Sequence, residues 1–257
     1  MSPKPPRTFH YHACAHAFSA NFTRPFHHQI DIQAQSALPV VGGHGHARVD
    51  GFEFRDFISF KKGYSHVSGR HQADDDSNNT LATSALEGLN MFDVLTADRV
   101  VSRLYSKHPA GAKEGNITWI GSKFENLRVA GFPVHIELNI PLFHELMTYE
   151  AAEKAFAKGG EFRKIAEDPL KTGAALKPAD VNGVFLCSIV KEIKVESPGV
   201  KVDGHSLYVP GFGKVFLGEL IIKPGEKALT MLRFELGSTT SGSGTGGGTR
   251  SNGSHYP

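Results

Sequence analysis

The chain has 257 residues, with 28 Lys and Arg against 26 Asp and Glu, so its formal net charge is only +2 with histidine neutral. This length is enough for one domain with a sizeable core. So small a net charge gives no general attraction to polyanions, and we expect no nucleic acid partner. No apolar run reaches the roughly 18 residues that a membrane-spanning helix needs, so we also expect no membrane insertion.

Cysteine usage and the N-terminus leave the compartment open. Cys14 and Cys187 are far apart and match neither a CxxC motif nor a zinc-finger spacing, which excludes a disulfide framework but leaves one long-range bridge or two buried thiols. The start "MSPKPPRTFHYHACAHAF" has basic residues but no apolar core of a signal peptide. That absence predicts a cytoplasmic location, or a secreted protein if a signal was removed beforehand.

The first elements are expected to be strands. Residues 1–8 are a Pro-rich, loose lead-in to a single β-rich domain over residues 9–237. In "FHYHACAHAF", Phe9, Tyr11 and the alanines share one parity, and the other parity is that of His10, His12, Cys14, His16 and Phe18. "QIDIQAQSALPV" alternates in the same way and places Ile30 and Ile32 on one face. Both patterns predict strands, the second of them half-buried.

Four later segments open with glycine and continue into an apolar or aromatic run: residues 51–60, 88–104, 121–138 and 211–222. They are unevenly spaced, so they do not announce a fixed-period repeat. In the last of them, Pro224-Gly225 provides the fixed and the positive φ of a tight turn between "KVFLGELII" and "ALTMLRFEL", which predicts a β-hairpin. The fold class is therefore mainly β, a layered or solenoid-like domain.

A short helical insertion is expected at about residues 141–168. Pro141 suits a helix start, Glu150 and Lys154 form an i,i+4 pair, and Gly159-Gly160 suits a helix end. A second helical piece, "EFRKIAED", ends before Pro169.

Residues 238–257 form a Gly/Ser-rich C-terminal segment with almost no apolar side chain before Tyr256. Such a composition does not bury enough surface to order itself unless it lies along another body. We therefore expect a tail that pairs with an exposed strand edge of a neighbouring subunit, and a homo-oligomer as the result.

Three stretches resemble a known family. "LEGLNMFDVLTADRVVSRLYSKH", "GSKFENLRVAGFPV" and "VKEIKVE…YVPGFGKVFLGELII" follow the order of motifs in bacterial proteins grouped as choice-of-anchor P, over roughly residues 84–236. The resemblance implies a bacterial β-rich protein and, for many family members, secretion. It implies no reaction, because it carries no catalytic residues over to this sequence.

The 14 histidines are the main candidates for chemistry. His44 and His46 in "VVGGHGHARVDGF" share one face of a strand, as do His10 and His12, and imidazole is the commonest ligand of transition metals. Further ligands are available from His16, His66, His71 or the acidic run at 74–76. No HExxH or 2-His-1-carboxylate spacing is present, so the preferred interpretation of Gly42–His46 is a turn that enters a strand.

Other motifs favour structural roles. "ADDDSNN" lacks the glycine and distal glutamate of an EF-hand loop, and "YSHVSGRH" brings Ser65, Ser68, His66 and His71 together in sequence only. Cys187 lies in the apolar run "FLCSIV", where burial disfavours a nucleophilic thiolate. The aromatic residues Tyr64, Trp119, Tyr208 and Phe212 are a weak signature for sugar stacking and a stronger one for packing.

The sequence therefore predicts a non-enzymatic structural, assembly or binding protein that self-associates through its C-terminal tail. The alternative is a His-rich, metal-dependent enzyme or metal-binding protein that uses a transition metal ion at His44 and His46 with His10 and His12. No other cofactor is implied.

Overall fold

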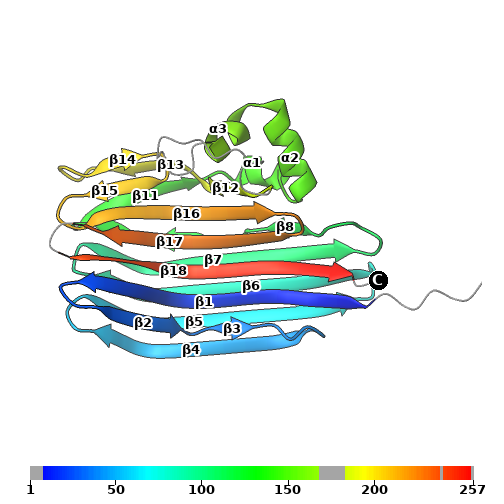
Figure 1. The fold of residues 1–257 in the computed structure, drawn as a ribbon, viewed down its shortest axis with the longest axis horizontal. Coiled ribbons are helices and arrows are strands. Elements are labelled where there is room, and N and C mark those ends of the chain that lie inside the picture. Colours follow the sequence, from blue (N-terminus) through cyan, green and yellow to red (C-terminus); the bar gives the residue numbers. More distant parts are fainter. Residues whose placement is uncertain (1–7, 168–182, 238–239, 256–257) are drawn as a thin grey trace, which may run out of the picture.

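The computed structural model describes residues 8–167, 183–237 and 240–255. Two antiparallel sheets pack face to face, and three short helices lie beside them at one corner (Figure 1). This confirms the layered alternative for the fold class. No helix in the described ranges is both long and apolar enough to cross a lipid bilayer.

The front sheet of Figure 1 has the order β14-β15-β16-β17-β18-β1-β2, with β12 paired to β16 and β3 paired to β1. Its strands are β1 (Phe9–Arg24), β2 (His28–Gln33), β3 (Ser36–Ala37), β12 (Phe185–Ser188), β14 (Lys201–Asp203), β15 (Ser206–Val209), β16 (Gly213–Lys223), β17 (Glu226–Leu236) and β18 (Ser241–His255).

The back sheet has the order β13-β11-β10-β7-β6-β5-β4, with β8 and β9 paired to β7. Its strands are β4 (Gly43–Phe54), β5 (Ile58–Gln72), β6 (Ser77–Met91), β7 (Leu95–Pro109), β8 (Asn116–Thr118), β9 (Lys123–Glu125), β10 (Arg128–Val129), β11 (Phe132–Leu138) and β13 (Val190–Val195). Consecutive strands β4 to β7 form a meander of hairpins rather than solenoid coils.

The predicted strands and hairpin are present. The alternation in "FHYHACAHAF" is confirmed as strand β1, in which Phe9, Tyr11, Ala13 and Ala15 face the interior. Pro224-Gly225 connects β16 to β17, with Lys223 paired to Glu226 across the turn. The second predicted strand is β2, where Ile30 is buried but Ile32 is 51% exposed. The register between β1 and β2 shifts at this point, which turns Ile32 outward.

Two of the glycine-opened segments mark a kink rather than a repeat. Gly51 in β4 and Gly88 in β6 have φ values of +67° and +65°, a backbone conformation that favours glycine. At the same level of β5, Phe60 and Gly63 both face inward although two residues separate them. The alternation of buried and exposed residues thus changes phase at the same level of neighbouring strands. This change of phase explains the glycine that opens the segments 51–60 and 88–104.

The C-terminal segment is not a tail, and the predicted domain boundary at residue 237 is wrong. Residues 241–255 form β18, which is hydrogen-bonded to β17 on one edge and to β1 on the other. Neighbouring side chains supply the apolar surface that β18 lacks, since Phe234 lies over Gly244 and Phe9 over Gly253. A Cβ at Gly244 would lie 2.5 Å from Phe234 Cζ, so this close approach requires glycine.

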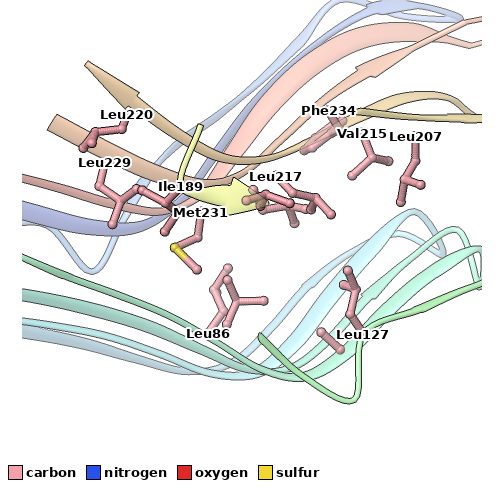
Figure 2. Close-up of a cluster of buried hydrophobic side chains, with 14 of the residues drawn as sticks. Leu86, Leu127, Ile189, Leu207, Val215, Leu217, Leu220, Leu229, Met231 and Phe234 are labelled. Carbon is pink, nitrogen blue, oxygen red and sulfur yellow. The ribbon is translucent and has the colours of Figure 1, made fainter. Parts of the chain in front are cut away.

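The core fills the space between the sheets (Figure 2). Leu217, Leu229, Met231 and Phe234 of the front sheet project toward Leu86 of the back sheet, and all five are fully buried. Burial of apolar surface on this scale is the main stabilising contribution to such a sandwich.

The helical insertion is confirmed as α1 (Ile140–Glu145), α2 (Tyr149–Lys158) and α3 (Glu161–Glu167), and residue 168 lies outside the described residues. The helical segment is interrupted between α1 and α2, where two backbone carbonyls accept hydrogen bonds from outside the helices. Buried Lys227 of β17 donates to the carbonyl of Leu146, and Ile117 N donates to the carbonyl of Met147 at 2.9 Å. Burial lowers the pKa of Lys227 to about 8. Because this value is still above neutral pH, the buried amine that makes this contact is mostly charged.

Candidate binding site on the front sheet

The histidines predicted as metal ligands lie on opposite faces of the molecule. His10 and His12 point outward from β1 in the front sheet, whereas His44 and His46 point outward from β4 in the back sheet. Because the inner sides of the two sheets pack together, these pairs cannot share an ion. Among the described residues, no three His, Cys, Asp or Glu side chains are grouped as a metal site.

The preferred interpretation of Gly42–His46 agrees with the structure. Gly42 N donates to the carbonyl of Pro39 at 2.9 Å in a turn, and β4 begins at Gly43. His46 is paired across the strands with His66 of β5, which the sequence did not reveal. On the front sheet, His12 lines a hollow of about 470 Å³ together with Cys14, Glu226 and Arg250.

The remaining sequence candidates have structural contacts. Ser65 is buried and donates to Ser36 Oγ at 2.8 Å, while His66 beside it faces outward, so they do not form a catalytic pair. Asp75 in the acidic run accepts hydrogen bonds from Ser77 and Lys107. Trp119 is buried in the core and packs edge-on against Phe143.

A different site lies where one edge of β16 is shared by two strands. β15 pairs with Gly213–Phe216 and β12 pairs with Glu219–Ile222, so the edge is split at Leu217 and Gly218. The carbonyl of His205 accepts from Leu217 N at 3.0 Å, and Ser188 Oγ donates to the carbonyl of Leu217 at 2.8 Å. These bonds fix the β14–β15 turn and the end of β12 against the split.

A hollow of about 420 Å³ opens over this split edge on the outer side of the sheet. Its walls are part apolar and part charged: Leu186, Cys187, His205, Lys214, Phe216, Glu219, Leu220, Ile221, Thr230, Arg233 and Glu235.

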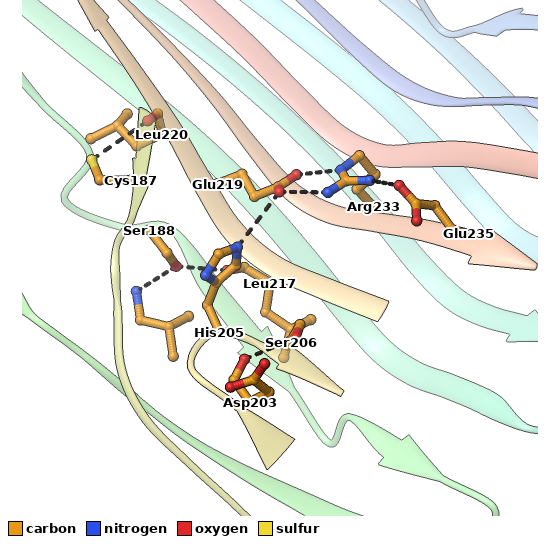
Figure 3. A network of polar contacts seen from close by, with 11 residues as sticks. Cys187, Ser188, Asp203, His205, Ser206, Leu217, Glu219, Leu220, Arg233 and Glu235 are labelled. Atoms are coloured by element: carbon orange, nitrogen blue, oxygen red, sulfur yellow. Dashed lines mark hydrogen bonds and ion pairs between the residues drawn. The ribbon is translucent and has the colours of Figure 1, made fainter. Parts of the chain in front are cut away.

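Three charged groups of the hollow, Arg233, Glu219 and Glu235, compensate one another (Figure 3). Arg233 donates from Nε and Nη2 to the two carboxylate oxygens of Glu219, at 2.6 Å and 2.8 Å, and from Nη1 to Glu235. Its guanidinium carbon also lies 3.7 Å from the ring centroid of Phe216. His205 Nε2 is 3.6 Å from Glu219 Oε1 and has no hydrogen-bond partner among the described residues.

These contacts set the protonation of the site. Burial on its own raises the pKa of Glu219, but the interactions with Arg233 and His205 outweigh it and lower the pKa to about 2. Complete burial raises the pKa of the Cys187 thiol to about 12, and its Sγ donates to the carbonyl of Leu220. The carboxylate is therefore permanently charged and the thiol permanently protonated near neutral pH, which suits neither for acid–base or nucleophilic chemistry.

Sequence reasoning missed this site because its members come from three strands and a turn. The available signal was the presence of charged residues inside two apolar strands, Glu219 in "FLGELII" and Arg233 with Glu235 in "MLRFEL". Only the hairpin register brings Glu219 and Arg233 together.

The fold and the hollow define a two-layer antiparallel β protein with a charge-compensated outer site. The chain belongs to the DUF8256 family, a domain of unknown function, whose profile matches residues 9–223. No curated protein and no solved structure shows a significant match to it. The resemblance to choice-of-anchor P proteins stays a prediction.

Proposed function

We propose that the protein is a non-enzymatic binding protein that takes a short peptide segment of a partner into the hollow of the front sheet. The observation that supports this function is the closed charge network, in which Arg233 joins Glu219 to Glu235. A site built for proton transfer needs a group whose pKa lies near the operating pH. Here the shifted groups, Glu219 and Cys187, have pKa values far from neutrality.

The walls of the hollow fit a peptide. Leu186 and Ile221 offer an apolar surface for one side chain, and Glu235 and Lys214 at the rim offer polar contacts for a backbone. Because the charged groups are already held in place, a ligand pays little entropy to order them.

A titration of the ¹⁵N-labelled full chain with pools of tripeptides tests this proposal. We expect pools with a large apolar central side chain to shift the amide signals of residues around Thr230 and Ile221. The variant Thr230→Trp fills the hollow and abolishes these shifts. The control Asn21→Trp places the same ring on the outer face of the same sheet, on β1, and is expected to retain the shifts, because Asn21 neither lines the hollow nor pairs with a residue that does.

Two outcomes contradict the proposal. One is a set of shifts that persists in Thr230→Trp, since binding then occurs elsewhere. The other is conversion of any peptide in the pools to a product, which would make the protein an enzyme.

Assembly is a second candidate function, and it does not use the C-terminal segment, because both edges of β18 are paired. The outer edge of β4 supports it instead. This strand of 12 residues ends the back sheet, and its hydrogen-bonded partner in the described residues is β5 alone. A free edge of this length pairs readily with another strand. Sedimentation velocity at rising concentration is expected to show a dimer, and a monomer throughout contradicts assembly.

A further inference from the structure

The outer side of the back sheet presents its side chains in rows that the strand register fixes. The row next to the Gly51–Gly88 kink consists of Asp50, Lys62, Glu87 and Arg99, so acidic and basic residues alternate from β4 to β7. Arg99 Nε lies 3.5 Å from Glu87 Oε1, and Asp50 binds Arg48 at 2.7 Å. This row compensates its own charge.

The rows farther from the kink carry no acidic residue. The first of these rows holds Arg48, Tyr64, Ala85 and Val101, and its arginine binds Asp50. Counted from β4 to β7, the second row runs His46, His66, Thr83 and Arg103. The next row runs His44, Ser68, Leu81 and Tyr105 on the same four strands.

A fourth row, on the three strands β5 to β7, is also basic, with Arg70, Asn79 and Lys107. We call the cationic and imidazole groups of the second to fourth rows that bind no described acidic side chain the acid-free patch: His44, His46, His66, Arg70 and Arg103.

The two arginines of the acid-free patch are not compensated. Lys107 binds Asp75 of the neighbouring turn, but no described residue forms an ion pair with Arg70 or Arg103. Both arginines are exposed. Their charges are therefore available to a ligand, in contrast to Arg233 on the front sheet.

We infer that the acid-free patch binds an acidic polysaccharide. Arginine binds carboxylates through two parallel hydrogen bonds. Arg70 lies on β5 and Arg103 on β7, with β6 between them in the back sheet. Adjacent strands are about 4.8 Å apart, so the patch spans about 14 Å from β4 to β7. That span accommodates several sugar units of an extended chain.

The groups between the charges favour a hydroxyl-rich polymer. Ser68, Asn79 and Thr83 are half-buried hydrogen-bonding side chains within the patch, and the ring of Tyr105 is 37% exposed. Nucleic acid is less well matched, because its affinity depends on many phosphate contacts, and the patch offers two uncompensated arginines, Arg70 and Arg103.

The test measures binding of the full chain to immobilised polygalacturonate at physiological salt by biolayer interferometry. We expect saturable binding that falls at least tenfold in affinity in the double variant Arg70→Gln/Arg103→Gln. Thr83→Glu, which places an acid between His66 and Arg103, is expected to weaken binding to a similar extent. The control Lys158→Gln/Lys201→Gln removes the same charge from exposed positions on α2 and β14 and is expected to stay within twofold.

Thermal unfolding of each variant shows that it is folded. The inference is overturned if polygalacturonate does not bind, or if the patch variants and the control bind equally. It is also overturned if neutral galactan of similar length binds as well, or if DNA at equal charge concentration binds more tightly than polygalacturonate.

Discussion

The outer faces of the two sheets are built on the same pleated scaffold and treat their charges in opposite ways. On the front sheet, Arg233 is bound by Glu219 and Glu235 and covers the ring of Phe216. On the back sheet, Arg103 lies in a row with His46, His66 and Thr83 and forms no ion pair with any residue that the structure describes. The first arrangement stabilises the fold, and the second leaves charge for a partner.

This difference shows why net charge is a poor guide to partners. The chain total of +2 averages a compensated face and an uncompensated one. Whether a basic side chain is available to a partner depends on where it lies in the strand register, and not on how many charges the chain carries.

The largest expected effect is the acid lability of the front face. The pKa of Glu219 falls from 4.5 in the unfolded chain to about 2 in the folded protein, so its ionised form contributes stability above pH 4.5 that is lost as the pH falls toward 2. A shift of this size corresponds to up to about 3 kcal/mol. Urea unfolding between pH 6 and pH 2.5 measures it, and Glu219→Gln is expected to flatten this part of the curve. An unchanged curve in Glu219→Gln assigns the acid lability to other carboxylates.

The inner side of the front sheet offers the next test. In Gly244→Val, the new side chain meets Phe234 Cζ, which lies 2.5 Å from an ideal Cβ position. Overpacking of this kind costs roughly 1–3 kcal/mol. Ser243→Val, the neighbouring residue on the exposed side of β18, is the matched control and is expected to change the free energy of unfolding by about 0.5 kcal/mol or less. Equal losses in the two variants contradict the close packing of β18 under Phe234.

The smallest expected effect is on the back face. Arg70→Gln and Arg103→Gln remove exposed groups without an acidic partner in the described residues, so each is expected to change the free energy of unfolding by about 0.5 kcal/mol or less. Urea titration measures these changes. A loss above about 1 kcal/mol in either variant means that the arginine has a structural role.

Local patterns in the sequence were sufficient for most of the fold. The alternation in "FHYHACAHAF" predicted the strand β1, Pro224-Gly225 predicted the β16–β17 turn, and Gly159 ends α2 as expected. The prediction for residues 238–257 was wrong because β18 takes its hydrogen bonds from both neighbours and its apolar cover from Phe9 and Phe234. The prediction used only the composition of the segment and took no account of the strands beside it.

The site was beyond local patterns for a related reason. His205, Glu219 and Arg233 come from a turn and two strands, and each has an ordinary local context. His44 and His46 stood out in the sequence, yet they face away from His10 and His12, because β1 and β4 belong to different sheets. The pairing register between strands that are distant in the sequence decides which side chains come together. Patterns within a single sequence do not predict this register.

The most direct test of the two-face account compares Arg233→Gln and Arg103→Gln in the same two assays, urea unfolding at pH 7 and binding to polygalacturonate. Arg233→Gln leaves the buried Glu219 carboxylate uncompensated and is expected to lose roughly 2–3 kcal/mol of stability while the folded protein keeps its polymer affinity. Arg103→Gln is expected to keep its stability and lose affinity. The account is contradicted if each variant loses both stability and affinity, or if neither variant loses either property.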